Sequence, residues 1–292
     1  MTTVFLRNIM FTGLTLLLLT FISCRKEAAI IPEKVPDFYQ LPQGNQSYDD
    51  SIVAFHQKYN AYILYKFSTF DLTYNYTNYL QVKSGPANPA WIKYTLEYFK
   101  SECLNFYPES FLQKTMPFKI LLAAYLDSFY RVGGTIGNVI DAGRTKTGFC
   151  ATRGTLTIGW ADSTLAAVLP TRRKELRGYM HRSYMEQSIS AGGIQIPQEF
   201  KKLSPETYSN SLTARDGLIE VPQNVGAFQP TLLWDFVCYV NAITSHTKAE
   251  LDATILKPSY DVSGLIQLKY AAVINFYRDK YGVDLQAIGE HP

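Results

Sequence analysis

The sequence predicts an α+β fold in which a small mixed sheet comes first and a helical lobe follows. Short runs of branched and aromatic residues, which are typical of strands, occur within the first 160 residues. A long helical pattern occupies residues 171–187, and more helical patterns fill the chain after residue 230. No internal repeat of about 20 to 50 residues is visible, which argues against solenoids and propellers.

Length and composition indicate an ordinary folded protein. The chain has 292 residues, of which 47% are hydrophobic and 18% are charged. Such a chain can bury one sizeable core or two small ones, so disorder does not describe it. The formal net charge of +3 is small and the basic residues are dispersed, which argues against nucleic acid as a main partner.

Residues 1–23 are predicted to be a lipoprotein signal peptide. Arg7 precedes an apolar run over residues 9–22, which is shorter than the roughly 18 to 20 residues that a bilayer requires. A small residue directly before Cys24 resembles the bacterial lipobox, in which the cysteine is lipidated, and acyl chains there would hold the protein at a membrane. Ordinary secretion with an incidental cysteine is the alternative. Residues 24–46, rich in Pro, Gln and charge, are expected to form a tether.

The first predicted elements follow this tether. Residues 50–58 have helical spacing, and residues 61–67 have the aromatic and branched content of a strand. Residues 71–79 are rich in Tyr and Asn and are expected to be a surface loop. A helix is then predicted over residues 91–103 and a buried strand over residues 118–125.

Glycine and proline punctuate the next stretch of the chain. Residues 83–89 are punctuated by one Gly and two Pro, which commonly interrupt helices and strands. Residues 133–148 are rich in Gly, but they lack the Gly-Lys-Ser/Thr ending of a phosphate loop, so turns and a hairpin are expected there. A strand predicted over residues 155–160 leads into the helix at residues 171–187, which places that helix directly behind a sheet.

The second half is predicted to be helical. Residues 232–243, 248–256 and 265–281 all show helical spacing of apolar residues. We therefore expect an α+β lobe over residues 47–190 and a helical C-terminal lobe over residues 191–292.

Three cysteines follow Cys24: Cys103, Cys150 and Cys238. An odd number gives no complete disulfide framework, and the wide spacings fit no zinc motif. One disulfide with a buried free thiol, or simple core packing of all three, are both open.

The helix at residues 171–187 is the centre of the functional prediction. Its apolar residues recur at positions i, i+3, i+4 and i+8, which is the stripe of a helix packed on a sheet or a second helix. These residues are Leu176, Tyr179, Met180 and Tyr184.

The same helix carries an altered version of a zinc motif. In a zinc hydrolase of the H-E-x-x-H kind, two His four residues apart are ligands, and the Glu beside the first is the general base. The five residues here are Arg177, Gly178, Tyr179, Met180 and His181. Only the second His position matches.

Several other segments carry a family resemblance in the right order and spacing. They are residues 59–65, which read Tyr-Asn-Ala-Tyr-Ile-Leu-Tyr, and residues 111–121, 196–200, 235–236 and 281–285. With the signal sequence and the central helix, the chain resembles the substrate import-associated zinc metallohydrolase lipoproteins of Bacteroidetes, also described as zinc-binding metallopeptidases. The resemblance implies a zincin-like metallopeptidase fold. It also implies, as partners, an outer-membrane TonB-dependent transporter and its substrate-binding lipoprotein.

The family's site residues map onto poor ligands in this chain. Its first ligand His falls on Arg177, its general-base Glu on Gly178 and its second His on His181. Its downstream acidic stretch, expected to give a carboxylate ligand, reads Trp-Asp-Phe-Val-Cys at residues 234–238, so only Asp235 stays acidic. Catalytic zinc normally takes three protein ligands and a water, and a guanidinium offers no lone pair.

Two interpretations stay open for each of these residues. Arg177 either joins a solvated basic face or fills the old cleft, where it would pair with Asp235 or an anionic ligand. That basic face would include Arg172, Arg173, Lys174 and Arg182. His181 is either a hydrogen-bonded helix residue or a vestigial metal ligand. The 21 Tyr and 17 Phe either pack in the core or line a sugar or peptide groove.

The resemblance and its failures together give a functional prediction. We expect a catalytically inactive, zinc-metallopeptidase-like lipoprotein at the outer membrane, on its periplasmic face or at the cell surface. It would need no cofactor and would assist TonB-dependent uptake of a peptide or glycan. The alternative is an active zinc metallohydrolase with non-standard ligands, such as His246 with Asp235.

Overall fold

The computed structural model describes residues 38–73, 81–131, 139–140, 148–220 and 229–292. The chain divides into two units, Met1–Tyr39 and Gln40–Pro292, and the second holds every element named below. The predicted signal peptide and Cys24 lie outside the described residues, as does most of the glycine-rich segment 133–148. Among the described residues, no helix combines the length and apolarity needed to cross a membrane.

The core sheet has four strands and is mixed. They are β1 (Tyr62–Leu64), β3 (Lys119–Arg131), β6 (Thr155–Ile158) and β5 (Phe149–Thr152), in the order β1-β3-β6-β5. β1 and β6 run parallel to β3, and β5 runs antiparallel to β6. The branched and aromatic runs that predicted strands in this region therefore belong to one sheet.

β3 continues beyond this core and pairs there with two more strands. β2 (Gln81–Pro86) and β4 (Val139–Ile140) both pair antiparallel with it. The strand β2 was not predicted, because it includes part of the Gly- and Pro-punctuated segment 83–89. Gly85 fits a strand here because the ring of Tyr125 lies where a Cβ would be, 2.3 Å from the nearest ring carbon.

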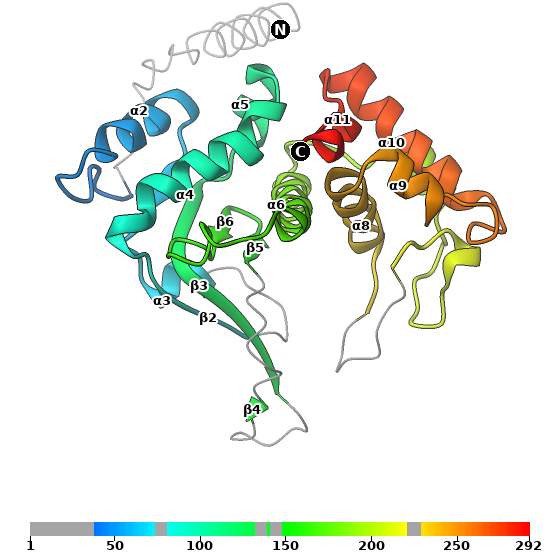
Figure 1. The fold of residues 1–292 in the computed structure, drawn as a ribbon, viewed down its shortest axis with the longest axis horizontal. Coiled ribbons are helices and arrows are strands. Elements are labelled where there is room, and N and C mark those ends of the chain that lie inside the picture. Colours follow the sequence, from blue (N-terminus) through cyan, green and yellow to red (C-terminus); the bar gives the residue numbers. More distant parts are fainter. Residues whose placement is uncertain (1–37, 74–80, 132–138, 141–147, 221–228) are drawn as a thin grey trace, which may run out of the picture. The chain divides into compact units, whose positions relative to one another are not determined.

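Helices of the first half flank this sheet (Figure 1). The predicted helices at residues 50–58 and 91–103 are confirmed as α2 (Asp49–Tyr59) and α4 (Pro89–Glu102). Asn88 caps α4 by accepting a hydrogen bond from Ala90 N. Two further helices were not predicted, η2 (Leu104–Phe106), a short 3-10 helix, and α5 (Glu109–Thr115).

The surface loop expected over residues 71–79 is partly wrong. Its first residues belong to a short helix, α3 (Thr69–Thr73), and residues 74–80 lie outside the described part of the chain. Ser68 shapes the start of α3, because its backbone N and Oγ both donate to Asp71 Oδ2.

The second half is helical, as predicted. Its long helices are α6 (Pro170–Ser190), α8 (Leu232–Ser245) and α10 (Leu265–Tyr281). Its short helices are α7 (Gln198–Lys202), the 3-10 helix η3 (Ala214–Asp216), α9 (Lys248–Ala253) and α11 (Leu285–Glu290). The predicted boundary between two lobes at residue 190 lies within the unit Gln40–Pro292, and it stays a prediction.

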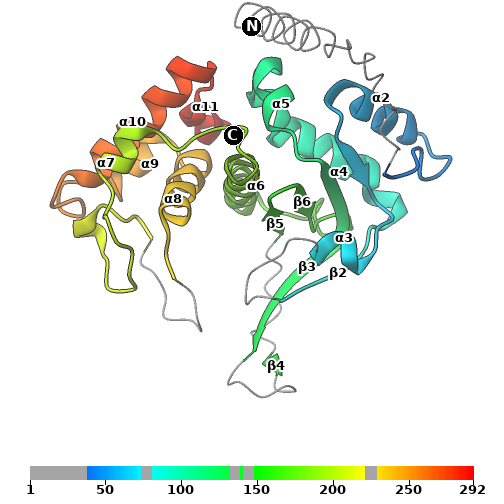
Figure 2. The same ribbon diagram turned by 180° about the vertical axis from the view of Figure 1, so that it is seen from behind.

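α6 lies between the sheet and α8, and both views of the fold show this arrangement (Figures 1 and 2). Leu176, Met180 and Tyr184 are fully buried in the core, as the stripe predicted. Tyr179 is the exception, because it is 39% exposed. The contact with α8 is instead made by the side of α6 that holds Gly178.

Candidate functional site

A buried polar stripe runs along α6. Arg177, His181, Tyr184 and Ser188 are spaced at i, i+4, i+7 and i+11, so they share one face of the helix. None of the four has measurable solvent exposure. Their polar partners come from α4, from Tyr107 directly after η2, from α5, and from α11 and the two residues after it.

Arg177 is bound by four hydrogen bonds. Its Nε donates to Glu102 Oε2 at 2.7 Å, and this ion pair has side-chain exposures of 0% and 7%. Its Nη1 donates to Ile288 O at 3.1 Å and to His291 O at 2.6 Å, while Nη2 donates to Pro292 O at 2.9 Å. One guanidinium thus joins α4, α6 and the segment that ends the chain.

This arrangement overturns the solvated-face interpretation of Arg177 and its expected pairing with Asp235, while binding of an anionic ligand stays a prediction. Arg177 is not on a solvated face, because a guanidinium this deeply buried needs a charged partner, which Glu102 supplies. It is also not paired with Asp235, whose partner is Lys269. Two of its basic neighbours keep surface pairs instead, Arg172 with Glu175 and Arg182 with Glu220.

His181 uses both of its ring nitrogens. Nε2 lies 2.9 Å from Glu102 O, and Nδ1 lies 2.6 Å from Tyr107 Oη. A carbonyl oxygen can only accept, so Nε2 carries the proton and Nδ1 accepts from the Tyr107 hydroxyl. The pKa of His181 is lowered to about 3, chiefly by burial and in part by the positive charge of Arg177, while the hydrogen bond to Glu102 O opposes both. The ring is therefore neutral, and its lone pair is already in a hydrogen bond.

The stripe continues toward the C-terminal end of α6 with two residues that bind α5. Tyr184 Oη and Thr115 Oγ1 share a hydrogen bond of 2.5 Å. Ser188 Oγ lies 3.2 Å from Thr115 O and 2.8 Å from Tyr184 O. These contacts hold α6 against α5, so this face serves packing along its whole length.

Gly178 lies where α6 and α8 approach closely. A Cβ at this position would meet Asn241 Oδ1 at 2.5 Å, Ser245 Cβ at 2.7 Å and Asn241 O at 2.9 Å. Contacts below about 3.0 Å require the neighbours to move, and one of them is backbone. The position that would hold a general base in the family therefore has no room for a Glu side chain.

Asp235 is enclosed by a different polar cluster. Its Oδ2 accepts from Lys269 Nζ at 2.5 Å and from Tyr208 Oη at 2.6 Å. Lys269 also donates to Gly217 O and lies over the Phe200 ring at 4.5 Å. Burial raises the pKa of Asp235 and lowers that of Lys269, while their mutual attraction opposes both changes.

The recruited pair of His246 and Asp235 does not converge. Asp235 is in the first turn of α8 and His246 is its C-cap, which separates them by roughly 16 Å along the helix axis at about 1.5 Å per residue. The His246 Nδ1 lies 2.8 Å from Ser245 Oγ. The described part of the chain contains no group of three or more His, Cys, Asp or Glu arranged to hold a metal ion.

The residues at the family's zinc positions therefore do not fit a zinc ion. Arg177 has no lone pair and carries a positive charge, Gly178 has no side chain, and the lone pair of His181 accepts from Tyr107. Asp235 is an acid of the right type, but it binds the Lys269 ammonium instead. No step of metal chemistry can be derived from this set.

No disulfide joins the described cysteines to one another. Cys103 and Cys238 are buried, and Cys150 is half-buried. Burial raises the pKa of the Cys103 and Cys238 thiols, which makes them less reactive. Of the two alternatives left open, core packing describes Cys103 and Cys238.

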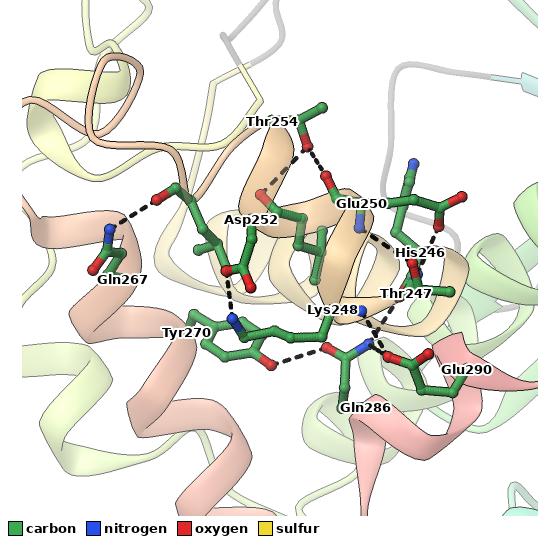
Figure 3. Close-up of polar contacts among 12 residues, drawn as sticks. His246, Thr247, Lys248, Glu250, Asp252, Thr254, Gln267, Tyr270, Gln286 and Glu290 are labelled. Atoms are coloured by element: carbon green, nitrogen blue, oxygen red, sulfur yellow. Dashed lines mark hydrogen bonds and ion pairs between the residues drawn. The ribbon is translucent and has the colours of Figure 1, made fainter.

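α11 is clasped to the end of α8, and this brings the end of the chain to Arg177. Figure 3 shows the contacts: Gln286 Nε2 donates to His246 O at 2.9 Å, and Lys248 N donates to Glu290 Oε1 at 2.7 Å. Gly289 lies so close to α8 that a Cβ would be 2.2 Å from two carbonyl oxygens of its last turn.

The docking of α11 on the end of α8 was not predicted, although the sequence contains two of the helix-capping patterns found there. Thr247 and Glu250 form a capping box at the start of α9, and this Thr-x-x-Glu pattern can be read from sequence. Asp284 likewise caps α11, by accepting from Gln286 N and Ala287 N. The docking of α11 on α8 depends on contacts that are distant in sequence.

Comparison with known proteins places the fold. No family model matches the sequence, and no curated protein matches it. A crystal structure from Bacteroides caccae, described as a "putative zinc-binding metallo-peptidase", is similar with a TM-score of 0.51 and 14% sequence identity. The match covers 85% of this chain and 92% of that chain. The likeness confirms the predicted zincin-like α+β fold with a helical C-terminal lobe, and at this identity it concerns the fold alone.

Proposed function

We propose that this chain is a metallopeptidase-like protein that no longer hydrolyses anything, with the former motif helix α6 retained for packing. The observation that carries this proposal is the buried Arg177–Glu102 ion pair at the family's first ligand position. The same helix has no space for a base at Gly178.

The positive charge of Arg177 opposes the binding of a zinc ion at this position. A unit charge about 4 Å away contributes roughly 4 kcal/mol per charge at an effective dielectric constant of 20, and the repulsion of a divalent ion by Arg177 would be larger. A guanidinium also remains protonated, so pH does not relieve this repulsion. Without a base to take a proton from water, hydrolysis would lack its second requirement.

The biological role that we propose is accessory. The protein is anchored by lipid at Cys24 to the outer membrane and assists a TonB-dependent transporter and its substrate-binding lipoprotein in taking up a peptide or glycan. The signal sequence, the family resemblance and the fold shared with the Bacteroides caccae structure support this role. It needs no zinc.

Metal analysis and a peptidase assay on the purified protein test the loss of catalysis. We expect substoichiometric zinc after incubation with zinc and removal of excess metal, and no peptide cleavage that a chelator abolishes. The variant His181→Ala is the matched comparison. Stoichiometric zinc in the parent protein that disappears in this variant would show that the site works.

Fractionation and affinity isolation test the accessory role. Cys24→Ser is expected to move the protein from the membrane fraction to the soluble fraction, because a single thiol position would carry the anchor. The parent protein, but not this variant, should be isolated together with an outer-membrane transporter after cross-linking. An unchanged membrane fraction for Cys24→Ser would remove the lipid anchor from the proposal.

A further inference from the structure

One face of α4 leads from a half-buried end to a buried one. Its side chains recur at i, i+3, i+7 and i+11, which places them on the same side of the helix: Trp91, Tyr94, Tyr98 and Glu102. Trp91 and Tyr94 are half-buried, and their ring centroids lie 5.8 Å apart. Tyr98 is only 5% exposed, and Glu102 pairs with Arg177 one turn further on. Solvent therefore reaches this face at its aromatic end.

Arg173 on α6 lies near Tyr98. Tyr98 is one turn before Glu102 on α4. Arg173 is one turn before Arg177, the partner of Glu102, on α6. Burial and the negative charge of Glu102 raise the pKa of Tyr98. The positive charges of Arg173 and Arg177 oppose this rise, so both guanidinium groups are close enough to act on the phenol.

Within the described part of the chain, Tyr98 and Arg173 both lack a polar partner for their side chains. Tyr98 Oη is buried and has no hydrogen-bond partner among the described residues. The Arg173 guanidinium is half-buried and forms no ion pair with any residue that the structure describes. A buried hydroxyl without a partner costs free energy, so such a group calls for an explanation.

An oxyanion would give both groups a partner at once. The raised pKa of Tyr98 keeps its hydroxyl protonated at neutral pH, so the hydroxyl can donate, and a guanidinium offers only donors. Glu102 neutralises Arg177, which leaves the single positive charge of Arg173 uncompensated at this place. A carboxylate has one negative charge and two acceptor oxygens, which matches this charge and these two donors.

We infer that Tyr98 and Arg173 form a binding site for a carboxylate. The half-buried rings of Trp91 and Tyr94 lie beside it on α4 and offer apolar contact area to the rest of the ligand. This inference rests on the proposed accessory function and deepens it, because it makes the ligand that is taken up acidic.

Calorimetry on the purified protein at low salt tests this site with two pairs of probes. Glucuronate is compared with glucose, and the α-amide of N-acetylglutamate with that of N-acetylglutamine, so that each pair differs in one carboxylate. The acid of at least one pair should bind at least about tenfold more tightly than its neutral partner, because hydrogen bonds to charged groups are the stronger ones. The pair with the larger ratio identifies a glycan or a peptide as the source of the carboxylate. No preference for the acid in either pair would overturn the inference.

Two arginine variants separate this site from general positive charge. Arg173→Met should remove the preference for the acid, because the uncompensated guanidinium is gone. Arg172→Met is the matched control and should keep the preference, since Arg172 is the neighbour of Arg173 on α6 but pairs with Glu175 at the surface. Equal preference for the acid in both variants would overturn the inference.

Tyr98→Phe separates a binding role from a structural one. The change removes only a hydroxyl that has no partner among the described residues, so the melting temperature should stay the same or rise. Binding of the acid should nevertheless weaken at least about fivefold, because the ligand loses one donor. A lower melting temperature, or unchanged binding of the acid, would overturn the inference.

Failure of this site and failure of the proposed function give different results. Stoichiometric zinc that depends on His181 would contradict the proposed loss of catalysis, but it would leave the ratio of acid to neutral binding unchanged. Equal binding of acid and neutral probes would contradict the carboxylate site and would not bear on zinc or hydrolysis. The two failures are therefore distinguishable.

Discussion

The contribution of Arg177 to stability depends on its buried ion pair with Glu102. Removing one member of a buried ion pair leaves the other charge uncompensated, which typically costs about 3–5 kcal/mol. We therefore expect Arg177→Met to lower the free energy of unfolding by about that amount, because Glu102 would lose its charged partner. Denaturant titration at pH 7 measures it. Arg172→Met is the matched control, with an expected change within about 0.5 kcal/mol, and an equal loss in both variants would contradict the prediction.

His181 should make the protein sensitive to mild acid. Its pKa is about 3 in the folded protein, against the usual value of 6.5. Between these pH values the unfolded chain binds more protons, so stability is complete above pH 6.5 and falls as the pH is lowered toward 3. The contribution is up to about 1.4 kcal/mol per pH unit.

Unfolding titrations at pH 7 and pH 5 measure this effect. The loss of stability between the two pH values should be smaller in His181→Gln, which no longer titrates, than in the parent protein. His246→Gln controls for the loss of a histidine at a surface position. If the parent protein and His181→Gln lose the same stability on acidification, His181 is not the group responsible.

The residues of the site could be predicted from sequence better than their partners. That Arg177 cannot bind zinc follows from its chemistry, and that it shares a helical face with His181 follows from their spacing. Its partner Glu102 lies 75 residues away, and the expected partner Asp235 instead pairs with Lys269, 34 residues away. Spacing within one helix carries no information on which side chain of another helix will face it.

At the scale of elements, the contact between α6 and α8 depends on the absence of a side chain at position 178. Gly178→Ala would place a Cβ within 3.0 Å of three atoms of α8, so the helices would have to separate. Overpacking of this kind typically costs about 1–3 kcal/mol. Gly154→Ala is the matched control, because its Cβ would meet only Phe118 Cβ at 3.8 Å.

Thermal unfolding of the two variants checks this prediction. Gly178→Ala should lower the melting temperature clearly, whereas Gly154→Ala should leave it nearly unchanged. For the same reason, restoring the motif with Arg177→His and Gly178→Glu should give a less stable protein and no hydrolytic activity. A stable double variant that cleaves peptides would show that α8 can move away and make room for the Glu side chain.

Long elements were predicted from sequence more accurately than short ones. The helix predicted at residues 265–281 has those bounds as α10, because its apolar period is sustained over several turns. α5 and α11 have seven and six residues, which is too short for a period to be decisive. β2 was missed because Gly85 and Pro86 are usually turn residues, and only the Tyr125 ring explains the Gly in a strand.

At the scale of the whole molecule, the proposed function means that the fold has been kept while the zinc motif has been lost. The chain shares a fold with the Bacteroides caccae structure at 14% identity, because packing demands only apolar residues of suitable volume at buried positions. A zinc site demands particular ligands, and the positions that the resemblance assigns to it hold Arg177, Gly178, His181 and Asp235. Among the described residues, Arg177 pairs with Glu102 and Asp235 pairs with Lys269, so ion pairs occupy two of the places where the resemblance puts metal ligands.

The proposed replacement of a metal site by ion pairs predicts the response of the whole protein to chelation. An ion that binds only the folded state raises the melting temperature, and its removal lowers it. Because Arg177 joins α4, α6 and the end of the chain without a metal, the melting temperature should be the same with EDTA, with added zinc and with neither. Circular dichroism on one preparation gives all three values, and Arg177→Met shows how far the transition falls when this junction is broken. A transition that moves down with EDTA and returns with zinc would mean that a metal, and not the guanidinium, holds these elements together.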